Sequence, residues 1–202
     1  MNPKKQPKPP SIIKPGEEKI RSFIAVPIPE QLRQAIGGMQ NTLKKRGMVL
    51  RWVKPENLHY TIKFLGNISP DIVDPLSEKL KELAAASPRF TMRLGGIGAF
   101  PNMRQAKVFW VGLQAGSGEL IRLAGQVSRI AGEFPTEADN KRFKPHLTIG
   151  RVKGRPSGRW PIPESFFKDS LGECECERIL LMKSTLAPGG SIYEVLSDNP
   201  LQ

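Results

Sequence analysis

The chain has 202 residues, of which 39% are hydrophobic and 25% are charged. This is an ordinary globular composition, and the length suffices for one substantial core. No run of about 18 apolar residues occurs, so the sequence predicts no membrane-spanning helix. Residues 1–19 lack the apolar core that a secretory signal needs. We therefore expect a soluble, cytoplasmic protein without a membrane partner.

The formal net charge of +12 is large for a chain of this size. Five lysines and two glutamates in residues 1–19 contribute +3, which leaves +9 for the remainder. The densest basic stretch extends from Lys141 to Arg159, and no acidic residue occurs from Asn140 to Pro163. Such a surplus indicates a polyanionic partner, with nucleic acid as the first candidate. A merely solvated basic surface is the alternative.

Residues 1–19 form a distinct segment that is rich in lysine and proline. This composition cannot bury enough apolar surface to offset the entropy lost on ordering. We expect a disordered extension over residues 1–19, followed by a single folded unit over residues 20–202. The extension could raise the affinity for nucleic acid through counterion release, or it could reflect a different translational start.

Hydrophobic spacing predicts the first elements, and Leu32, Ile36, Met39 and Leu43 recur at helical spacing. The elements predicted up to residue 88 are a strand over 21–27, a helix over 29–46 ended by Gly47, strands over 50–53 and 58–65 around a turn at 55–57, and a helix capped by Ser69 and ended by Ser87-Pro88.

A similar order of elements then repeats, which suggests two similar halves. The predicted elements are strands over 90–94 and 107–113, a helix over 117–132, a strand bearing His146, a proline-flanked segment over 161–171, and strands over 177–186 and 191–196 around the hairpin turn Pro188-Gly189-Gly190. The Gly95–Gly98 stretch matches no phosphate-binding motif and predicts a tight bend. Strands mixed with helices predict an α+β protein with mostly antiparallel pairing.

The two histidines of the chain, His59 and His146, lie in the same local context. Side chains alternate between the faces of a strand, so each histidine would share a face with the threonine two residues later. If the two halves are related by an approximate two-fold axis, both His-Thr pairs would face one cleft. The two segments are Leu58-His-Tyr-Thr-Ile62 and Pro145-His-Leu-Thr-Ile149.

This pattern points to acid–base chemistry on phosphate. Imidazole has an unperturbed pKa of about 6.5, so one ring can accept a proton while the other donates one. Two such transfers together contribute roughly 10⁴–10⁸-fold. The hydroxyls of Thr61 and Thr148 are neutral donors suited to phosphoryl oxygens. The sequence therefore predicts His59 and His146 as a catalytic pair that needs no metal.

Other interpretations compete for these residues. A single histidine in an apolar strand is more often structural than catalytic, although two matching copies weigh against that reading. Two histidines 87 residues apart fall short of a three-ligand metal set, which Cys174 and Cys176 could complete only if the fold brought them close. One residue of a predicted strand separates these cysteines, so we expect reduced thiols.

With these flanks, the paired HxT motif resembles the RNA 2′,3′-cyclic phosphodiesterases, historically called 2′-5′ RNA ligases, of the two-histidine (2H) phosphoesterase superfamily. The resemblance extends from about Ile20 to the C-terminus. It is carried by Phe23-Ile-Ala-Val-Pro27, Arg51-Trp-Val-Lys-Pro-Glu-Asn-Leu-His-Tyr-Thr-Ile-Lys-Phe-Leu-Gly66, Gly98-Ala-Phe-Pro101, Phe143-Lys-Pro-His-Leu-Thr-Ile-Gly-Arg-Val152, and the Pro188-Gly-Gly190 turn followed by Tyr193.

The resemblance implies a fold and a reaction. The fold is a bilobal, LigT-like α+β architecture in which two lobes of mostly antiparallel sheet, related by a pseudo-two-fold axis, enclose a central cleft with the helices outside. The reaction is the opening of a terminal RNA 2′,3′-cyclic phosphate to a 2′-phosphate, with no cofactor. His59 is implied as the general acid that protonates the departing 3′-oxygen, and His146 as the general base that activates water, with swapped roles as the alternative.

The resemblance also implies substrate-binding residues. Thr61 and Thr148 would hold phosphoryl oxygens, and Arg151 occupies the family position of a phosphate-contacting arginine. Simple alternation puts Arg151 on the strand face opposite His146, so a twist or a strand end is needed to bring it to the cleft. Phe64 is implied as a stacking surface for the terminal base, with packing in the core as the alternative.

Several functions remain in competition. Hydrolysis of cyclic phosphate ends leads, with fragments from tRNA processing as the natural candidates and a monomer as the expected state. Ligation of a cyclic phosphate end to a 5′-hydroxyl is the reverse reaction of the same acid–base pair. Exonucleolytic trimming of RNA 3′ ends fits the flanks less well. A non-catalytic RNA-binding module with the same cleft is the alternative from a different class.

Overall fold

A computed structural model describes residues 19–137, 142–154, 159–188 and 190–202. Of the predicted N-terminal extension, Lys19 alone lies within this range. The elements are β1 (Ile20–Pro27), α1 (Glu30–Lys45), β2 (Leu50–Trp52), η1 (Pro55–Asn57), β3 (His59–Ile68), η2 (Pro70–Ile72), α2 (Val73–Ala85), β4 (Phe90–Phe100), β5 (Val108–Ala115), α3 (Ser117–Ala131), β6 (Leu147–Val152), α4 (Ser165–Lys168), β7 (Ser170–Cys176), β8 (Arg178–Ala187) and β9 (Gly190–Pro200).

The strands form one sheet in the order β7-β4-β5-β6-β3-β1-β8-β9, and β2 pairs with β6. Every pairing among the described residues is antiparallel. The predicted α+β class with antiparallel pairing is confirmed. Two four-stranded halves meet where β3 lies beside β6.

The two halves of the sheet do not follow the two halves of the chain. The C-terminal hairpin β8–β9 returns to the first strand, with Leu181 opposite Ile24. Helix α1, from the first part of the chain, contacts β7 in the other half of the sheet. The repeated order of elements in the sequence therefore corresponds to two interleaved halves rather than to two successive ones.

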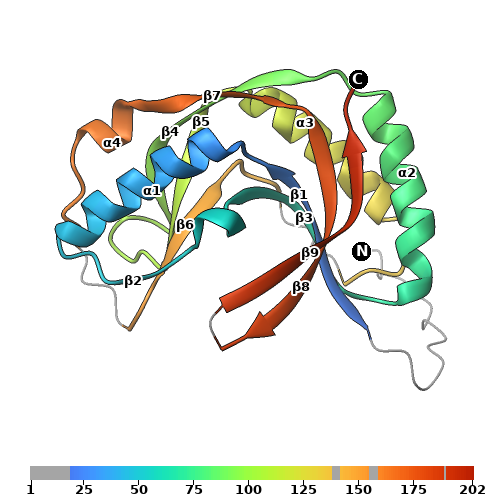
Figure 1. The fold of residues 1–202 in the computed structure, drawn as a ribbon, viewed down its shortest axis with the longest axis horizontal. Helices are drawn as coiled ribbons and strands as arrows, with labels where there is room; N and C mark the ends of the chain where they lie inside the picture. The colour runs from blue at the N-terminus through green and yellow to red at the C-terminus, as the bar shows by residue number, and fades with distance from the viewer. Residues whose placement is uncertain (1–18, 138–141, 155–158, 189) are drawn as a thin grey trace, which may run out of the picture.

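The three long helices enclose the core. Helix α2 contacts β8, β9 and α3, and α3 also contacts β3 and β5. The residues that predicted α1 by their spacing, Leu32, Ile36, Met39 and Leu43, are all buried. Figure 1 shows α1 and α2 at opposite ends of the molecule and the β8–β9 hairpin extending away from the helices. Among the described helices, none has the length and apolar character needed to span a bilayer.

Some element boundaries differ from the prediction. Strand β4 continues through Gly95–Gly98 to Phe100, where a tight bend was expected. Gly96 has a φ of 74° at a β-bulge facing β5, so the strand accommodates the glycines without ending. Helix α2 begins at Val73 rather than directly after Ser69, since a short 3₁₀ turn (η2) comes first.

A β-bulge in β6 changes which residues face each side of the sheet. Two consecutive residues of β5 pair with Thr148 and Gly150, so Ile149 is an extra residue on β6. Ile149 and Gly150 are both buried, and the alternation resumes one position later than in a regular strand. Arg151 therefore faces the same side as Thr148, which the regular alternation used for prediction does not give.

Strand β3 carries the same irregularity at the equivalent position. Consecutive residues of β1 pair with Thr61 and Lys63, so Ile62 is the extra residue. Ile62 is buried, and Lys63 Nζ donates a hydrogen bond to Ser128 Oγ of α3 at 3.0 Å, on the helix side of the sheet. Phe64 consequently faces the same side as Thr61.

Gln40 of α1 holds the β6 bulge from the core side. Its side chain is 3% exposed, and Nε2 donates to Ile149 O at 3.0 Å and to Val53 O at 2.9 Å. Val53 N donates to Ile149 O at 3.0 Å as well. Buried hydrogen bonds of this kind are costly to leave unmade. They fix β2 against β6, where Arg51 is the register partner of Arg151.

Tyr60 lies at the junction of the two halves. It forms the one register pair found between β3 and β6 among the described residues, opposite Leu147. Its side chain is fully buried, and the hydroxyl donates to Gly112 O of β5 at 3.1 Å. Tyr60 thereby connects three neighbouring strands.

Replacing this tyrosine tests the junction. Tyr60→Phe is expected to lower the free energy of unfolding by about 1–3 kcal/mol, because the buried Gly112 carbonyl loses its hydroxyl donor. Urea denaturation followed by circular dichroism measures the change. Tyr193→Phe is the matched control, since the Tyr193 hydroxyl makes no hydrogen bond to a described residue, and its effect should stay within about 0.5 kcal/mol. Equal effects of the two variants would contradict a specific role of the Tyr60 hydroxyl.

Candidate active site

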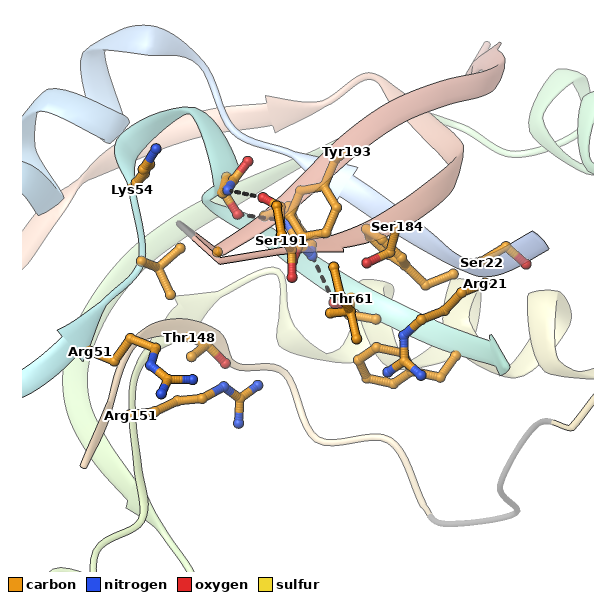
Figure 2. A pocket seen from close by; sticks show the side chains of 18 of the residues that line it. Arg21, Ser22, Arg51, Lys54, Thr61, Thr148, Arg151, Ser184, Ser191 and Tyr193 are labelled. Carbon is orange, nitrogen blue, oxygen red and sulfur yellow. Dashed lines mark hydrogen bonds between the residues drawn. The ribbon is translucent and has the colours of Figure 1, made fainter. Parts of the chain in front are cut away.

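A cleft of about 930 Å³ opens on the face of the sheet that does not carry the core. Both His-Thr pairs line it, one from β3 and one from the start of β6. The β8–β9 hairpin forms a further wall through Ser184, Leu186, Ser191 and Tyr193. Figure 2 shows Thr61 and Tyr193 on one side of this space and Thr148 on the other.

The register between β3 and β6 fixes how the two pairs face each other. Because the strands are antiparallel, His59 lies across from Thr148, and Thr61 lies across from His146. The arrangement is approximately symmetric about the junction. The structure thus brings the four predicted motif residues together in one cleft.

His59 is held by hydrogen bonds on both ring nitrogens. Nδ1 lies 2.8 Å from Asn57 O, which can only accept, so Nδ1 is the protonated nitrogen. In the neutral ring Nε2 is then an acceptor, and the Thr61 hydroxyl donates to it at 2.9 Å. Asn57 Nδ2 donates in turn to Ser191 O at 2.9 Å. This bond ties the turn that orients His59 to the β8–β9 hairpin.

His146 is oriented in the same way. Its Nδ1 donates to Lys144 O at 2.7 Å, again a carbonyl two residues earlier in the chain. Its Nε2 has no hydrogen-bond partner in the part of the chain that the structure describes. His146 immediately precedes β6, which begins at Leu147, rather than lying within a strand as predicted. In the neutral form of both histidines, Nε2 is therefore the nitrogen without a proton.

Aromatic rings pack against both histidines. Phe23 stacks on His59 with ring centroids 5.0 Å apart and an interplanar angle of 24°. Tyr193 is nearly perpendicular to His59, with ring centroids 5.3 Å apart. Phe100 contacts His146 edge-on at 5.0 Å. The site prediction did not include these rings, because a strand aromatic normally predicts a core position. All three rings did lie in the segments that carry the family resemblance.

Burial shifts the titration of both histidines. It lowers the pKa of His59 from 6.5 to about 4, against the opposing effect of the hydrogen bond to Asn57 O and with a smaller contribution from the nearby charge of His146. Burial also lowers the pKa of His146, opposed by the bond to Lys144 O and assisted by the positive charge of Arg151. Both rings are therefore neutral in the free protein at neutral pH.

The two residues that lie five positions after the histidines both line the cleft. The bulge in β6 brings Arg151 to it, which resolves the conflict with simple alternation. Phe64 also lines the cleft and is 54% exposed, so the alternative of core packing for Phe64 is wrong. Because β3 and β6 are antiparallel, Phe64 and Arg151 lie toward opposite ends of the cleft.

Basic side chains that the motifs did not predict also line the cleft. They are Arg21, Arg51, Lys54 and Lys153. The one carboxylate in the described lining, Glu137, lies 3.7 Å from Lys19 Nζ and accepts a hydrogen bond from Asn67. Net charge predicted a basic surface, but it carries no information about which cations face the cleft. Which basic side chains face the cleft depends on the register of the strands.

Within the described residues, no three His, Cys, Asp or Glu side chains form a group that could hold a metal ion. Cys174 and Cys176 are free thiols on β7 and do not line the cleft. Burial raises their pKa values to about 11 and about 12, so both thiols stay protonated at neutral pH.

Sequence comparison places the chain among known proteins. Residues 26–110 match the family model of LigT-like phosphoesterases. The RNA 2′,3′-cyclic phosphodiesterase of Archaeoglobus fulgidus is 34% identical over 177 residues, which cover 88% of this chain and 98% of the relative. The RNA 2′,3′-cyclic phosphodiesterase of Methanocaldococcus jannaschii is 35% identical over 186 residues, which cover 89% and 99%.

Solved structures also show similarity to this family. A crystal structure of a Thermus thermophilus protein superposes with a TM-score of 0.75 at 30% identity, over 90% of this chain and 98% of that one. E. coli LigT in complex with 3′-AMP superposes with a TM-score of 0.74 at 26% identity, over 92% and 99%. The likeness therefore covers both halves of the sheet. The chain belongs to the LigT-like phosphoesterases, the hydrolase family of the RNA 2′,3′-cyclic phosphodiesterases.

Proposed function

We propose that this protein hydrolyses the 2′,3′-cyclic phosphate at the end of an RNA chain to a 2′-phosphate, by metal-independent acid–base catalysis with His59 and His146. The observation that carries the proposal is the convergence of two His-Thr pairs on one cleft, each with Nδ1 bound to a backbone carbonyl. This orientation reserves both Nε2 atoms for a substrate placed between the rings.

The proposed step has one water, one bond formed and one bond broken. The neutral ring of His146 takes a proton from water, whose oxygen attacks phosphorus. The bond from phosphorus to the 3′-oxygen breaks, and protonated His59 donates its proton to the departing oxygen. The products are a 2′-phosphomonoester and a free 3′-hydroxyl. After release of the product, His146 returns its proton to solvent, and His59 takes up a proton from solvent when the next anionic substrate binds.

Thr61, Thr148 and Arg151 would stabilise charge on the phosphoryl group during this step. The hydroxyls of Thr61 and Thr148 can donate to the non-bridging oxygens from opposite sides of the cleft. In the free protein the Thr61 hydroxyl donates to His59 Nε2 instead. Substrate binding would therefore redirect this hydroxyl and free Nε2. Arg151 supplies positive charge at one end of the cleft.

Three observations favour an RNA end as the substrate. The relatives from Archaeoglobus and Methanocaldococcus carry the name of an RNA 2′,3′-cyclic phosphodiesterase, and E. coli LigT binds 3′-AMP. The net charge of +12 suits a polyanion. We include fragments from tRNA processing among the proposed substrates.

We also propose that the protein is a monomer, since both His-Thr pairs come from one chain.

Single substitutions of the histidines test the catalytic pair. With EDTA present, the wild-type protein should convert a short RNA with a 2′,3′-cyclic phosphate end to the 2′-phosphate product. His59→Ala and His146→Ala should each lower kcat by at least ~10²-fold, because each removes one proton transfer. Chromatography that separates 2′- from 3′-phosphate ends measures the rates.

Arg122→Ala is the control variant, since Arg122 lies on α3, is 72% exposed and pairs with Glu119 outside the cleft. Circular dichroism verifies the fold of each variant. Full activity of His59→Ala would disprove the acid–base pair. Activity that appears only when a divalent metal is added would disprove metal independence, and binding of the RNA without turnover would favour a binding module.

The lowered histidine pKa values predict an acidic pH optimum for kcat/KM. This parameter reports the free enzyme, in which one ring must be protonated and the other neutral. The value of kcat/KM should decrease as the pH drops below about 4, because both rings become protonated. It should also decrease as the pH rises, with the midpoint of this upper limb below pH 6.5, because both rings become neutral. The negative substrate favours the imidazolium, so the upper limb of kcat should lie at higher pH. If the upper limbs of kcat/KM and kcat coincided above pH 6.5, the expected lowering of the histidine pKa values by burial would be contradicted.

A further inference from the structure

The two ends of the cleft differ in chemistry. At one end Phe64 is 54% exposed, and its ring centroid lies 6.1 Å from that of Phe23. At the other end the residue in the equivalent position is Arg151, and Arg51 faces it from β2. An apolar, aromatic end and a cationic end thus flank the same pair of histidines.

The cationic end has an unfavourable feature in the free protein. Arg51 and Arg151 are direct register partners on β2 and β6, both are exposed, and both line the cleft. Like charges directly opposite each other destabilise a sheet. Among the described residues no carboxylate forms an ion pair with either. Lys54 and Lys153 add positive charge to the same wall.

The core side of the sheet fixes this pair in position. Strand β2 has three residues, and its described pairing is with β6. Gln40 joins the segment that follows β2 to the β6 bulge through its bonds to Val53 O and Ile149 O. Figure 2 shows the side chains of Arg51 and Arg151 extending together into the cleft near Thr148. Two guanidinium groups held this way can bind one phosphate in a planar, bidentate manner.

We propose that Arg51 and Arg151 form a second phosphate subsite, which binds the internucleotide phosphate preceding the terminal cyclic phosphate. The inference rests on the proposed function. In a nucleoside 2′,3′-cyclic phosphate the base is attached to C1′, the neighbour of C2′. The RNA chain continues on the other side of the ribose, from C3′ through C4′ and C5′. With the cyclic phosphate between the histidines and the base on Phe64, the 5′-linked phosphate extends toward Arg51. The protein would therefore favour oligonucleotide ends over cyclic mononucleotides.

Three substrates with the same terminal nucleotide test the subsite. They are a nucleoside 2′,3′-cyclic monophosphate with a free 5′-hydroxyl, a trinucleotide with the same cyclic end, and this trinucleotide with a neutral methylphosphonate at the last linkage. The wild-type protein should prefer the charged trinucleotide. Arg51→Ala should lower kcat/KM on that substrate by about tenfold or more, as expected for loss of a charge-assisted hydrogen bond. On the other two substrates the variant should match the wild type.

Arg122→Ala removes the same charge from α3 and should leave all three rates unchanged. Arg51→Lys keeps the charge without the bidentate geometry and should recover part of the preference. An equal loss on mononucleotide and trinucleotide would overturn the proposal, because Arg51 would then act at the cyclic phosphate or on the fold. No loss on either substrate would overturn it as well.

Affinity provides a readout that does not require turnover. Fluorescence anisotropy with a trinucleotide ending in a 2′-phosphate should show weaker binding by Arg51→Ala, again by about tenfold. The slope of log K against log salt should fall in magnitude by about 0.7, the value for one phosphate contact on a single strand. If the wild-type protein hydrolyses none of the substrates, the proposed function fails, and this measurement still decides for or against the subsite.

Discussion

The antiparallel contact between β3 and β6 is the constraint on which the site depends. Tyr60 and Leu147 are opposite each other at this contact, and both are buried in the core. Their immediate neighbours must then face the other side of the sheet. One register pair therefore determines that both His-Thr pairs share a cleft and that each histidine faces the threonine of the other pair. A shift of one residue in either strand would bury a histidine.

The bulges add a second level of organisation to this junction. Each strand has one extra residue just after its threonine, Ile149 in β6 and Ile62 in β3. Bulges re-aim side chains, and here they turn the residue five positions after each histidine into the cleft. The backbone is alike in the two halves, but the side chains differ, since one half presents Phe64 and the other Arg151. A pseudo-symmetric backbone thus carries an asymmetric binding surface, which suits a substrate with a base on one side and a phosphate chain on the other.

Burial and charge have opposite effects on the protonation of the proposed catalytic pair. Packing against Phe23 and Tyr193 fixes the ring of His59, but the same burial lowers its pKa to about 4. The neutral rings favoured in the free protein provide a base but no acid at neutral pH. In the proposed reaction the negative charge of the substrate raises the histidine pKa again, since a phosphate between the rings favours an imidazolium. Protonation of the acid would thereby be coupled to binding.

The sequence by itself determined the α+β class, the buried face of α1 and the pairing of two histidines with two threonines in matching contexts. These features depend on local periodicity, which is visible along the chain. The order of strands in the sheet, the return of β8–β9 to β1 and the cleft position of Arg51 are decided by contacts between distant segments. The side on which Arg151 lies is the clearest case. Simple alternation gives the wrong face, because an extra residue in β6 is defined only relative to β5, and a buried amide from α1 holds it there.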